Sequence, residues 1–396
     1  GCDVISIPHN PNLSNGRMFA LWYQDLAPSA QREEAARRAR LEPLVEVMQA
    51  KGESECRNGL SGIVGERDEL CDFEKIRGLA DPPEDCGEGS GSGALAGTGC
   101  ISRRDFVRNV LIEGLREESR LGVNPFRFGL IGSTDTHHSN PGATDERRFD
   151  GITALLSDTP VKRLSPRASG RGIQSLYRNP GGLAGVYAEE NSRESLFDAM
   201  KRRETFATSG TRITPRLFGA WDLPDQVCRR PDQTVLGYEL GVPMGSLLPD
   251  RPGGAGSPIF LASALRDPGS AGLLQRIQLI KGWVDEDGQL HQKVFDVAGD
   301  PGNVADVDLE TCTPRGPGAD TLCAAWRDPD FDPTRPAVYY ARVLENPSCR
   351  WSALQCLALP ATERPASCAD PGIPKLVQER AWTSPIWYVP GGQADS

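Results

Sequence analysis

The sequence predicts an α/β fold over residues 1–210 and a β-rich, sandwich-like region over residues 211–396. Before residue 210, apolar runs of strand length alternate with amphipathic helical segments, and this alternation favours parallel βα units. After residue 210 the helical periodicity disappears, and short alternating runs follow one another between turns. A chain of 396 residues is long enough for two or three domains with cores of their own.

The first elements of the α/β half are two short strands with a helix between them. The apolar run at 3–9 predicts a strand, and the run at 44–48 predicts a buried one. Residues 29–40 follow Pro28 and consist mostly of Ala, Arg and Glu, which are strong helix formers, so we expect a surface helix there. Residues 87–99 hold so many glycines that only an exposed loop is expected.

The next predicted helix, at 102–122, has signals at both ends. Ser102 is placed to cap its first turn, with Asp105 three residues later, and Gly122 stops it. One face of this helix is apolar and consists of Phe106, Val107, Val110, Leu111 and Leu115. The run at 128–135 then predicts a strand that ends in polar residues.

A basic loop at 160–181 separates this strand from the last strand and helix of the α/β half. The strand is predicted at 186–188. The helix has Asn191 as its N-cap, with Glu194 three residues on. We expect it to bury three side chains, which are Leu196, Phe197 and Met200.

The second half shows strand periodicity in four places. The runs lie at 259–262, 277–283, 294–297 and 338–344. The turn at 285–288 contains Asp-Gly, which favours a hairpin between the second and third of these runs.

The composition excludes several classes of partner. The 44 basic and 54 acidic residues give a net charge of −10, which disfavours binding to nucleic acid or to anionic lipid. No apolar run approaches the length of a membrane span. Among the possible partners, a small-molecule substrate is therefore expected. The sequence does not indicate an oligomeric state.

Eleven cysteines point to an oxidising compartment. Many lie at short separations in polar sequence: Cys56 and Cys71, Cys86 and Cys100, Cys312 and Cys323, and then Cys349, Cys356 and Cys368. No CxxC pair or zinc-finger spacing is present, so disulfides are favoured over zinc knuckles, with scattered reduced thiols as the alternative. The odd count leaves one thiol over, and Cys2 is the candidate.

The chain starts at Gly1 and enters a strand-like run at once. We therefore expect a piece that begins inside a domain, with a signal peptide upstream of Gly1. Together with the cysteines, this predicts an exported protein, periplasmic or extracellular.

Three of the four histidines follow predicted strands of the α/β half. Loops at the carboxyl ends of parallel strands form the active sites of such folds. Asp135 and His137 are two residues apart, so in extended backbone they point to the same side and can hold one cation. His9 could supply a third ligand for Zn, Mn or Fe, with His138 facing away. The plainer alternative is that Asp135 only caps a turn.

Other polar residues near these positions are open to two interpretations. Glu46 is either a ligand or base of the site, or a buried carboxylate paired with Lys51. The loop with Asn10, Asn15 and Arg17 lies beside His9 and either orients a substrate or forms a structural turn. The fourth histidine, His291, is expected on the surface of the β-rich half. No serine-nucleophile elbow or phosphate-binding glycine loop is present.

The runs at 7–17, 42–55, 132–137, 188–212 and 381–388 resemble the bacterial domain-of-unknown-function family 3604 over essentially the whole chain. That family is similar to the polymerase and histidinol phosphatase (PHP) superfamily, whose distorted β/α barrels hold two or three divalent metals and hydrolyse phosphoesters. The resemblance matches His9 to a late strand-end ligand, and Asp135 and His137 to the closing Asp-x-His. The His-x-His that opens the superfamily barrel has no counterpart here.

The resemblance implies that residues 1–210 are the later part of a PHP-like barrel whose N-terminal strands are missing. It implies a metal-dependent hydrolase of phosphoesters or related bonds that uses a metal-bound hydroxide. Without the opening His-x-His we expect this stretch of chain to be inactive. The alternative is an exported, non-catalytic binding module with a structural metal site.

Overall fold

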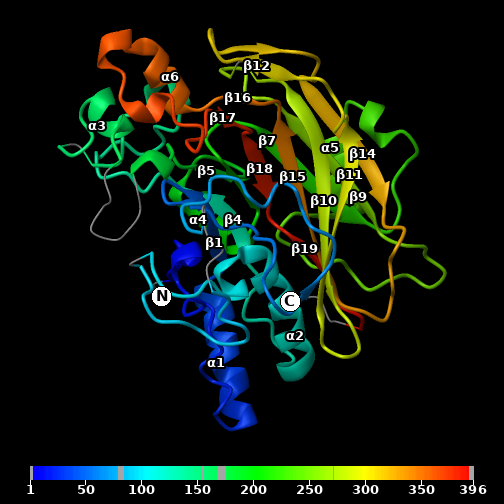
Figure 1. The fold of residues 1–396 in the computed structure, drawn as a ribbon. Coiled ribbons are helices and arrows are strands. Elements are labelled where there is room, and N and C mark those ends of the chain that lie inside the picture. The colour runs from blue at the N-terminus through cyan, green and yellow to red at the C-terminus, as the bar shows by residue number, and fades with distance from the viewer. Residues whose placement is uncertain are drawn as a thin grey trace.

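The computed structural model describes residues 3–78, 84–95, 97–153, 155–166, 175–270 and 272–391 (Figure 1). These residues form several sheets together with helices, so the predicted mixture of helix and strand is confirmed. No sheet within the described ranges closes into a barrel. Residues 167–174 of the predicted basic loop, and Cys2, lie outside the described residues.

A small sheet contains two of the strands predicted for the α/β half, and these two pair in parallel. It consists of β1 (Leu44–Gln49), β2 (Gly52–Glu53) and β4 (Gly129–Gly132), in the order β2-β1-β4. Strands β1 and β4 run parallel, with Leu44 opposite Gly129. All six residues of β1 are buried, as expected for a strand covered on both faces.

A large sheet of eight strands crosses the predicted boundary at residue 210. Its strands are β3 (Ile63–Val64), β5 (Leu183–Val186), β6 (Thr205–Thr208), β10 (Leu274–Val284), β11 (Leu290–Gly299), β15 (Ala337–Glu345), β18 (Arg380–Thr383) and β19 (Ile386–Tyr388). Their order is β3-β11-β10-β15-β18-β6-β5, and β19 also pairs with β15. Strands β5 and β6 pair antiparallel, which corrects the prediction of parallel units up to residue 210. The division into two domains stays a prediction.

A third sheet lies against the large one. It consists of β7 (Thr214–Ala220), β8 (Val242–Pro243), β9 (Ile259–Leu265) and β14 (Thr321–Arg327), in the order β14-β9-β7-β8. Apolar side chains of β7 and β9 share one buried cluster with those of β10, β15 and β18. The β-rich half is therefore built around a core between two sheets.

The helices pack on the three larger sheets and on one another. They are α1 (Pro28–Leu41), α2 (Val107–Leu121), α3 (Pro160–Leu164), α4 (Arg193–Lys201), α5 (Gln233–Leu240) and α6 (Trp351–Ala358). Helix α2 packs on β10, where Gly282 permits the close approach, because a Cβ there would lie 2.4 Å from Cγ1 of Ile112. In Figure 1, α3 and α6 lie together at the upper left.

Short elements complete the described chain. Two small strand pairs are β12 (Asp306–Asp308) with β13 (Thr313–Arg315), and β16 (Ser348–Cys349) with β17 (Leu376–Val377). The 3₁₀ turns are η1 (Pro11–Leu13), η2 (Arg103–Asp105), η3 (Glu146–Arg148), η4 (Ser175–Tyr177), η5 (Val227–Arg229), η6 (Ala361–Glu363) and η7 (Ala366–Cys368).

Two predicted elements differ from the structure at the start of the chain and after the Gly-rich loop. Residues 3–9 form no strand, although Glu46 donates its N–H to the carbonyl of Pro8 at 3.0 Å. Proline has no N–H to continue a ladder, so the segment only follows β1. Ser102 and Asp105 do form a capping box, but it caps η2, and α2 starts only at Val107.

Other differences concern the later helices. Pro160 begins a short helix, α3, inside the predicted loop, because Thr159 caps it and proline is favoured in the first turn. Ser192, and not Asn191, caps α4. The three apolar side chains expected beneath α4 are only half-buried, and Ala199 is the buried residue.

Five disulfides are present. They join Cys56 to Cys71, Cys86 to Cys100, Cys228 to Cys323, Cys312 to Cys349, and Cys356 to Cys368. The prediction of disulfides is confirmed. In the described part of the chain, no helix has both the length and the apolarity that crossing a membrane requires.

Candidate functional site at the carboxyl ends of β1 and β4

The parallel pairing of β1 and β4 brings two strand ends to one edge of the small sheet. The N–H of Ser133 donates to the carbonyl of Met48 at 2.9 Å, and the N–H of Ala50 donates to the carbonyl of Thr134 at 3.3 Å. The residues that follow both strands are thereby held side by side. This is the edge at which parallel strands place functional side chains.

Glu46 joins three segments at this edge. Its buried carboxylate accepts a hydrogen bond from the N–H of Asn10 at 3.2 Å and another from the hydroxyl of Ser133. Asn10 has a left-handed φ of 57°, a conformation that asparagine tolerates better than most residues. Glu46 therefore fixes the turn after residue 9 against the ends of β1 and β4.

Lys51 forms an ion pair with Asp135, while the carboxylate of Glu46 accepts from Asn10 and Ser133. Asp135 lies just after β4 with a left-handed φ of 48°, which turns the chain at the strand end. Both side chains are largely covered, at 16% and 27% exposure. The ammonium therefore lies where a cation bound to Asp135 would lie.

The three histidines around this edge have different environments. His9 and His137 are exposed. The N–H of His137 donates to the carbonyl of Ile152 at 2.8 Å, so its backbone is fixed while its imidazole faces solvent. His138 places Nε2 3.1 Å from the carbonyl oxygen of Gly151. Within the described ranges, His9, Asp135 and His137 do not form a group with all ligand atoms within 4.8 Å of one another.

Four carboxamides surround the end of β1 and are almost fully buried. Each has one polar atom with no hydrogen-bond partner among the described residues: Asn10 Oδ1, Asn12 Oδ1, Gln49 Nε2 and Asn179 Nδ2. Asn12 donates from Nδ2 to the carbonyl of Lys51 at 2.9 Å, and Gln49 accepts from the N–H of Lys51 at 3.0 Å. Buried polar atoms are nearly always paired, so these atoms call for water or a ligand.

The residues beside His9 also hold the Gly-rich loop. Arg17 is exposed and donates from Nε to the carbonyl of Gly91 at 2.8 Å. Asn15 is fully buried and donates to the carbonyl of Thr98 at 2.9 Å. Arg17 and Asn15 thus contact the Gly-rich loop, whereas Asn10 contacts Glu46 at the strand ends.

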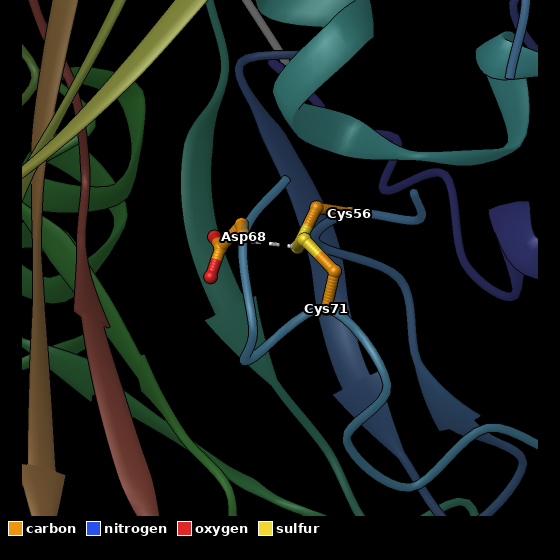
Figure 2. Close-up of side chains that lie close together, drawn as sticks. All are labelled: Cys56, Asp68 and Cys71. Atoms are coloured by element: carbon orange, nitrogen blue, oxygen red, sulfur yellow. Dashed lines mark hydrogen bonds between the residues drawn. A yellow bond between two sulfur atoms is a disulfide. The ribbon is translucent and has the colours of Figure 1, made fainter. Parts of the chain in front are cut away.

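Two groups of side chains have ligand atoms close enough to hold a metal ion. They are Cys56, Asp68 and Cys71, and Glu53, Glu55 and Cys56. Figure 2 shows that Cys56 and Cys71 are joined by a disulfide, with Oδ2 of Asp68 4.0 Å from Sγ of Cys56. A cystine has no thiolate to offer, so neither group provides thiolate ligands while this disulfide is intact.

The carboxylates of these two groups are already neutralised by buried cations. Arg108 and Arg342 each contact both Glu55 and Asp68. Lys75 pairs with Glu53. Burial by itself raises the pKa of Glu55, but the charges of Arg342 and Arg108 outweigh it and lower the pKa to about 2. These groups are therefore assigned to stability, and the edge of β1 and β4 is the candidate site.

Comparison with known families gives a match over nearly the whole chain. The model of a family described as "Protein of unknown function (DUF3604)" matches residues 1–390. The chain belongs to the DUF3604 family. A search of curated proteins found no match to it. The description of the DUF3604 family assigns no activity, so a function for this DUF3604 chain has to be argued from its own site.

Several contributors to the site of this DUF3604 chain were missed by sequence reasoning. Ser133, Asn12, Gln49 and Asn179 carry no motif that marks them. The first three lie near the ends of predicted strands, and this position is the signal that could have identified them. Asn179 comes from the predicted basic loop, and only the tertiary fold places its N–H 3.5 Å from the carbonyl of Ala50.

Proposed function

We propose that the edge formed by β1 and β4 is the site of a metal-dependent hydrolase that acts on phosphoesters or related bonds. The observation that carries this proposal is the concentration of buried polar side chains there, four of which leave one polar atom without a hydrogen-bond partner among the described residues. Two carboxylates, a lysine and four carboxamides meet at one strand edge. An unpaired buried polar group costs about 1–3 kcal/mol, so a fold has no reason to collect them for stability alone.

In this proposal His9, Asp135 and His137 hold a divalent ion, which is Zn, Mn or Fe, in a cluster of two or three such ions. Imidazole nitrogens and a carboxylate suit these ions, and the two exposed imidazoles have no partner among the described residues. When bound, the ion would supply a Lewis acid that lowers the pKa of water and stabilises developing negative charge.

The side chains around the ion would bind and orient the substrate. Glu46 fixes Asn10 and Ser133, so its removal would loosen both segments at once. Arg17 is exposed and donates from Nε to the carbonyl of Gly91, and it follows His9 by eight positions. A small anionic substrate is favoured, because Lys51 and Arg17 are both cations.

Further ligands are required for this chemistry. The predicted ligands do not form a closed three-residue group within the described ranges, and no His-x-His occurs in residues 1–396. We therefore propose that additional strands and ligands complete a PHP-like barrel. We also propose that residues 1–396 alone do not hydrolyse substrates. Five disulfides support export to the periplasm or the exterior.

The test is metal analysis of the complete gene product, with turnover measured on a panel of phosphomonoesters and phosphodiesters. His137→Ala and Asp135→Asn should each lower metal content and abolish metal-dependent turnover. His291→Ala is the matched control, because His291 binds Asp285 and stacks on Trp283 in the β-rich half.

The second candidate, a non-catalytic binding module, is supported by the Lys51–Asp135 pair, which neutralises the carboxylate without a metal. Bound metal without turnover on the broad panel would favour this module. Turnover that survives both substitutions would refute the proposed site.

A further inference from the structure

A cavity lies beside the loop that follows β4. It has a volume of about 560 Å³, within the range of small-molecule sites. Its wall is formed by the loop around η3, by residues 210–212, by Asp267, Gly269, Ser270 and Gly272, and by Glu379 just before β18. The cavity is distinct from the edge of β1 and β4, although the loop after β4 reaches both.

Glu379 is the deepest carboxyl group of this cavity. Its side chain lines the wall, yet the residue is only 3% exposed. The hydroxyl of Ser209 donates to Oε2, while no described residue donates a hydrogen bond to Oε1. A Cβ on Gly210, which also lines the wall, would lie 3.5 Å from this Oε1. One oxygen of a buried carboxyl group is thus left for whatever fills the cavity.

Glu146 is the second acid of the wall, and it lacks a cation of its own. The N–H of Trp351 donates to its Oε2. The nearest buried cation, Arg350, is engaged by Glu74 in a bidentate pair at 2.7 and 2.9 Å. Burial raises the pKa of Glu146 to about 8, against the opposing charge of Arg350. Burial and the charge of Glu146 also raise the pKa of Glu379.

A third acid, Glu345, lies directly behind the wall. Its Oε1 is buried without a partner, and its Oε2 accepts from the hydroxyl of Ser270 at 3.3 Å. A Cβ on Gly272 would lie 2.4 Å from that Oε2, so the carboxyl group touches the wall itself. The wall therefore contains an excess of acceptor oxygens and a deficit of positive charge.

The charged residues of the wall are five acids and three arginines. They are Asp145, Glu146, Asp150, Asp267 and Glu379, with Arg147, Arg148 and Arg212. Arg147 pairs with Asp145, and all three arginines are exposed. The interior is thus acidic and the rim carries the cations.

We propose that this cavity binds a small organic molecule through a primary ammonium group held between Glu379 and Glu146. An ammonium offers three N–H donors, which match the free oxygens of the two carboxyl groups. It also supplies a positive charge beside the buried Glu379 and the half-buried Glu146. A bare divalent ion would leave most of the 560 Å³ empty and would pass the arginine rim unfavourably. The rim suits a ligand that carries an anionic or polar end opposite its ammonium group.

Isothermal titration calorimetry of the disulfide-bonded protein tests this assignment. The probes are ethanolamine, putrescine and L-alanine, with sodium acetate and calcium chloride as comparison ligands. At least one amine should bind, and Glu379→Gln should weaken it by about tenfold or more, because a hydrogen bond to a charged group is lost. Asp150→Asn, which removes an exposed acid of the same wall, should change affinity by less than about twofold.

Glu146→Gln is a second variant, which is used in case Glu379→Gln does not fold. It should weaken binding of the same amine. Proton release offers an independent readout, measured by repeating the titration in buffers of different ionisation enthalpy. The charged groups near the pair are Glu74, Glu345, Arg350 and Arg380. Because the pKa of each acid is raised, binding of a protonated amine should release a proton, and the release should shrink in Glu379→Gln. Binding of calcium alone, or amine affinity equal in both Gln variants and wild type, would overturn the proposal.

Discussion

Nη1 of Arg342 donates to both carboxylate oxygens of Glu55, at 3.0 and 3.2 Å, although the two residues are 287 positions apart. Arg342 lies on β15 of the large sheet, and Glu55 follows β2 of the small sheet. Both side chains are at most 2% exposed. The pair therefore ties the segment that follows β2 of the small sheet to the centre of the large sheet.

Removing one member of this pair should be strongly destabilising. Arg342→Met leaves Glu55 and Asp68 with Arg108 as their remaining arginine, and breaking a buried pair in this way costs about 3–5 kcal/mol. Chemical denaturation measures the loss. Arg315→Met, which removes an exposed partner of Asp308, should cost less than about 1 kcal/mol. Equal effects of the two substitutions would contradict a stabilising role for the buried pair.

The same carboxylate predicts a loss of stability in acid. The pKa of Glu55 is about 2 in the folded protein, against an ordinary value of 4.5. Because the folded-state pKa is lowered, its contribution is complete above pH 4.5 and disappears as the pH falls toward 2. The size is about 3 kcal/mol at 1.36 kcal/mol per pKa unit. Denaturation at a series of pH values checks this, and Glu55→Gln should flatten the acid limb.

Glu345 predicts that stability also falls at the other end of the pH range, as the pH rises. Burial raises its pKa to about 7, although the hydroxyl of Ser270 opposes the rise, and Asp267 adds to it. A raised folded-state pKa means that the stabilising contribution is complete below pH 4.5 and is lost as the pH rises through 7. Glu345→Gln, which mimics the protonated group, should remove up to about 3 kcal/mol of this decline. The exposed Glu286→Gln is the control and should leave the pH profile unchanged.

The disulfides should differ in their contributions according to the loops they close. Cys228 and Cys323 are 95 residues apart, whereas Cys356 and Cys368 are 12 apart. Loop-closure entropy predicts losses of about 4–5 kcal/mol for the paired Ser variant of the first disulfide and about 3 kcal/mol for the second. Thermal and denaturant unfolding of the two double variants measures the order. A larger loss for the short loop would show that local packing, and not chain entropy, dominates.

Lys51 should compete with a metal for Asp135. If the edge of β1 and β4 binds a divalent ion, Lys51→Met should tighten manganese or zinc binding by about tenfold, because one positive charge next to the carboxylate is removed. Lys162→Met removes the exposed partner of Asp158 and is the matched control. Calorimetric titration with each metal salt gives the affinities. Weaker binding in Lys51→Met would mean that the lysine supports the ligand set.

Part of the fold could be predicted from local signals alone. The helix at 28–41, the strand at 44–49 and the hairpin of β10 and β11 lie where composition, periodicity and turn residues indicate them. The cystines Cys56–Cys71 and Cys86–Cys100 join cysteines at the short separations that suggested disulfides. The parallel pairing of β1 with β4 was also predictable, because alternation of strand and helix favours it.

The sequence by itself determined the elements, the oxidised cysteines and the strand ends at which polar residues follow, since each depends on neighbours within a few positions. Only the tertiary structure decided that Lys51 meets Asp135 while Glu46 meets Ser133, that Cys323 pairs with Cys228 and Cys312 with Cys349, and that β5 and β6 join the large sheet. The physical reason is that these contacts depend on how separate layers pack. A charged residue looks the same in the sequence whether it faces water or a buried partner hundreds of residues away.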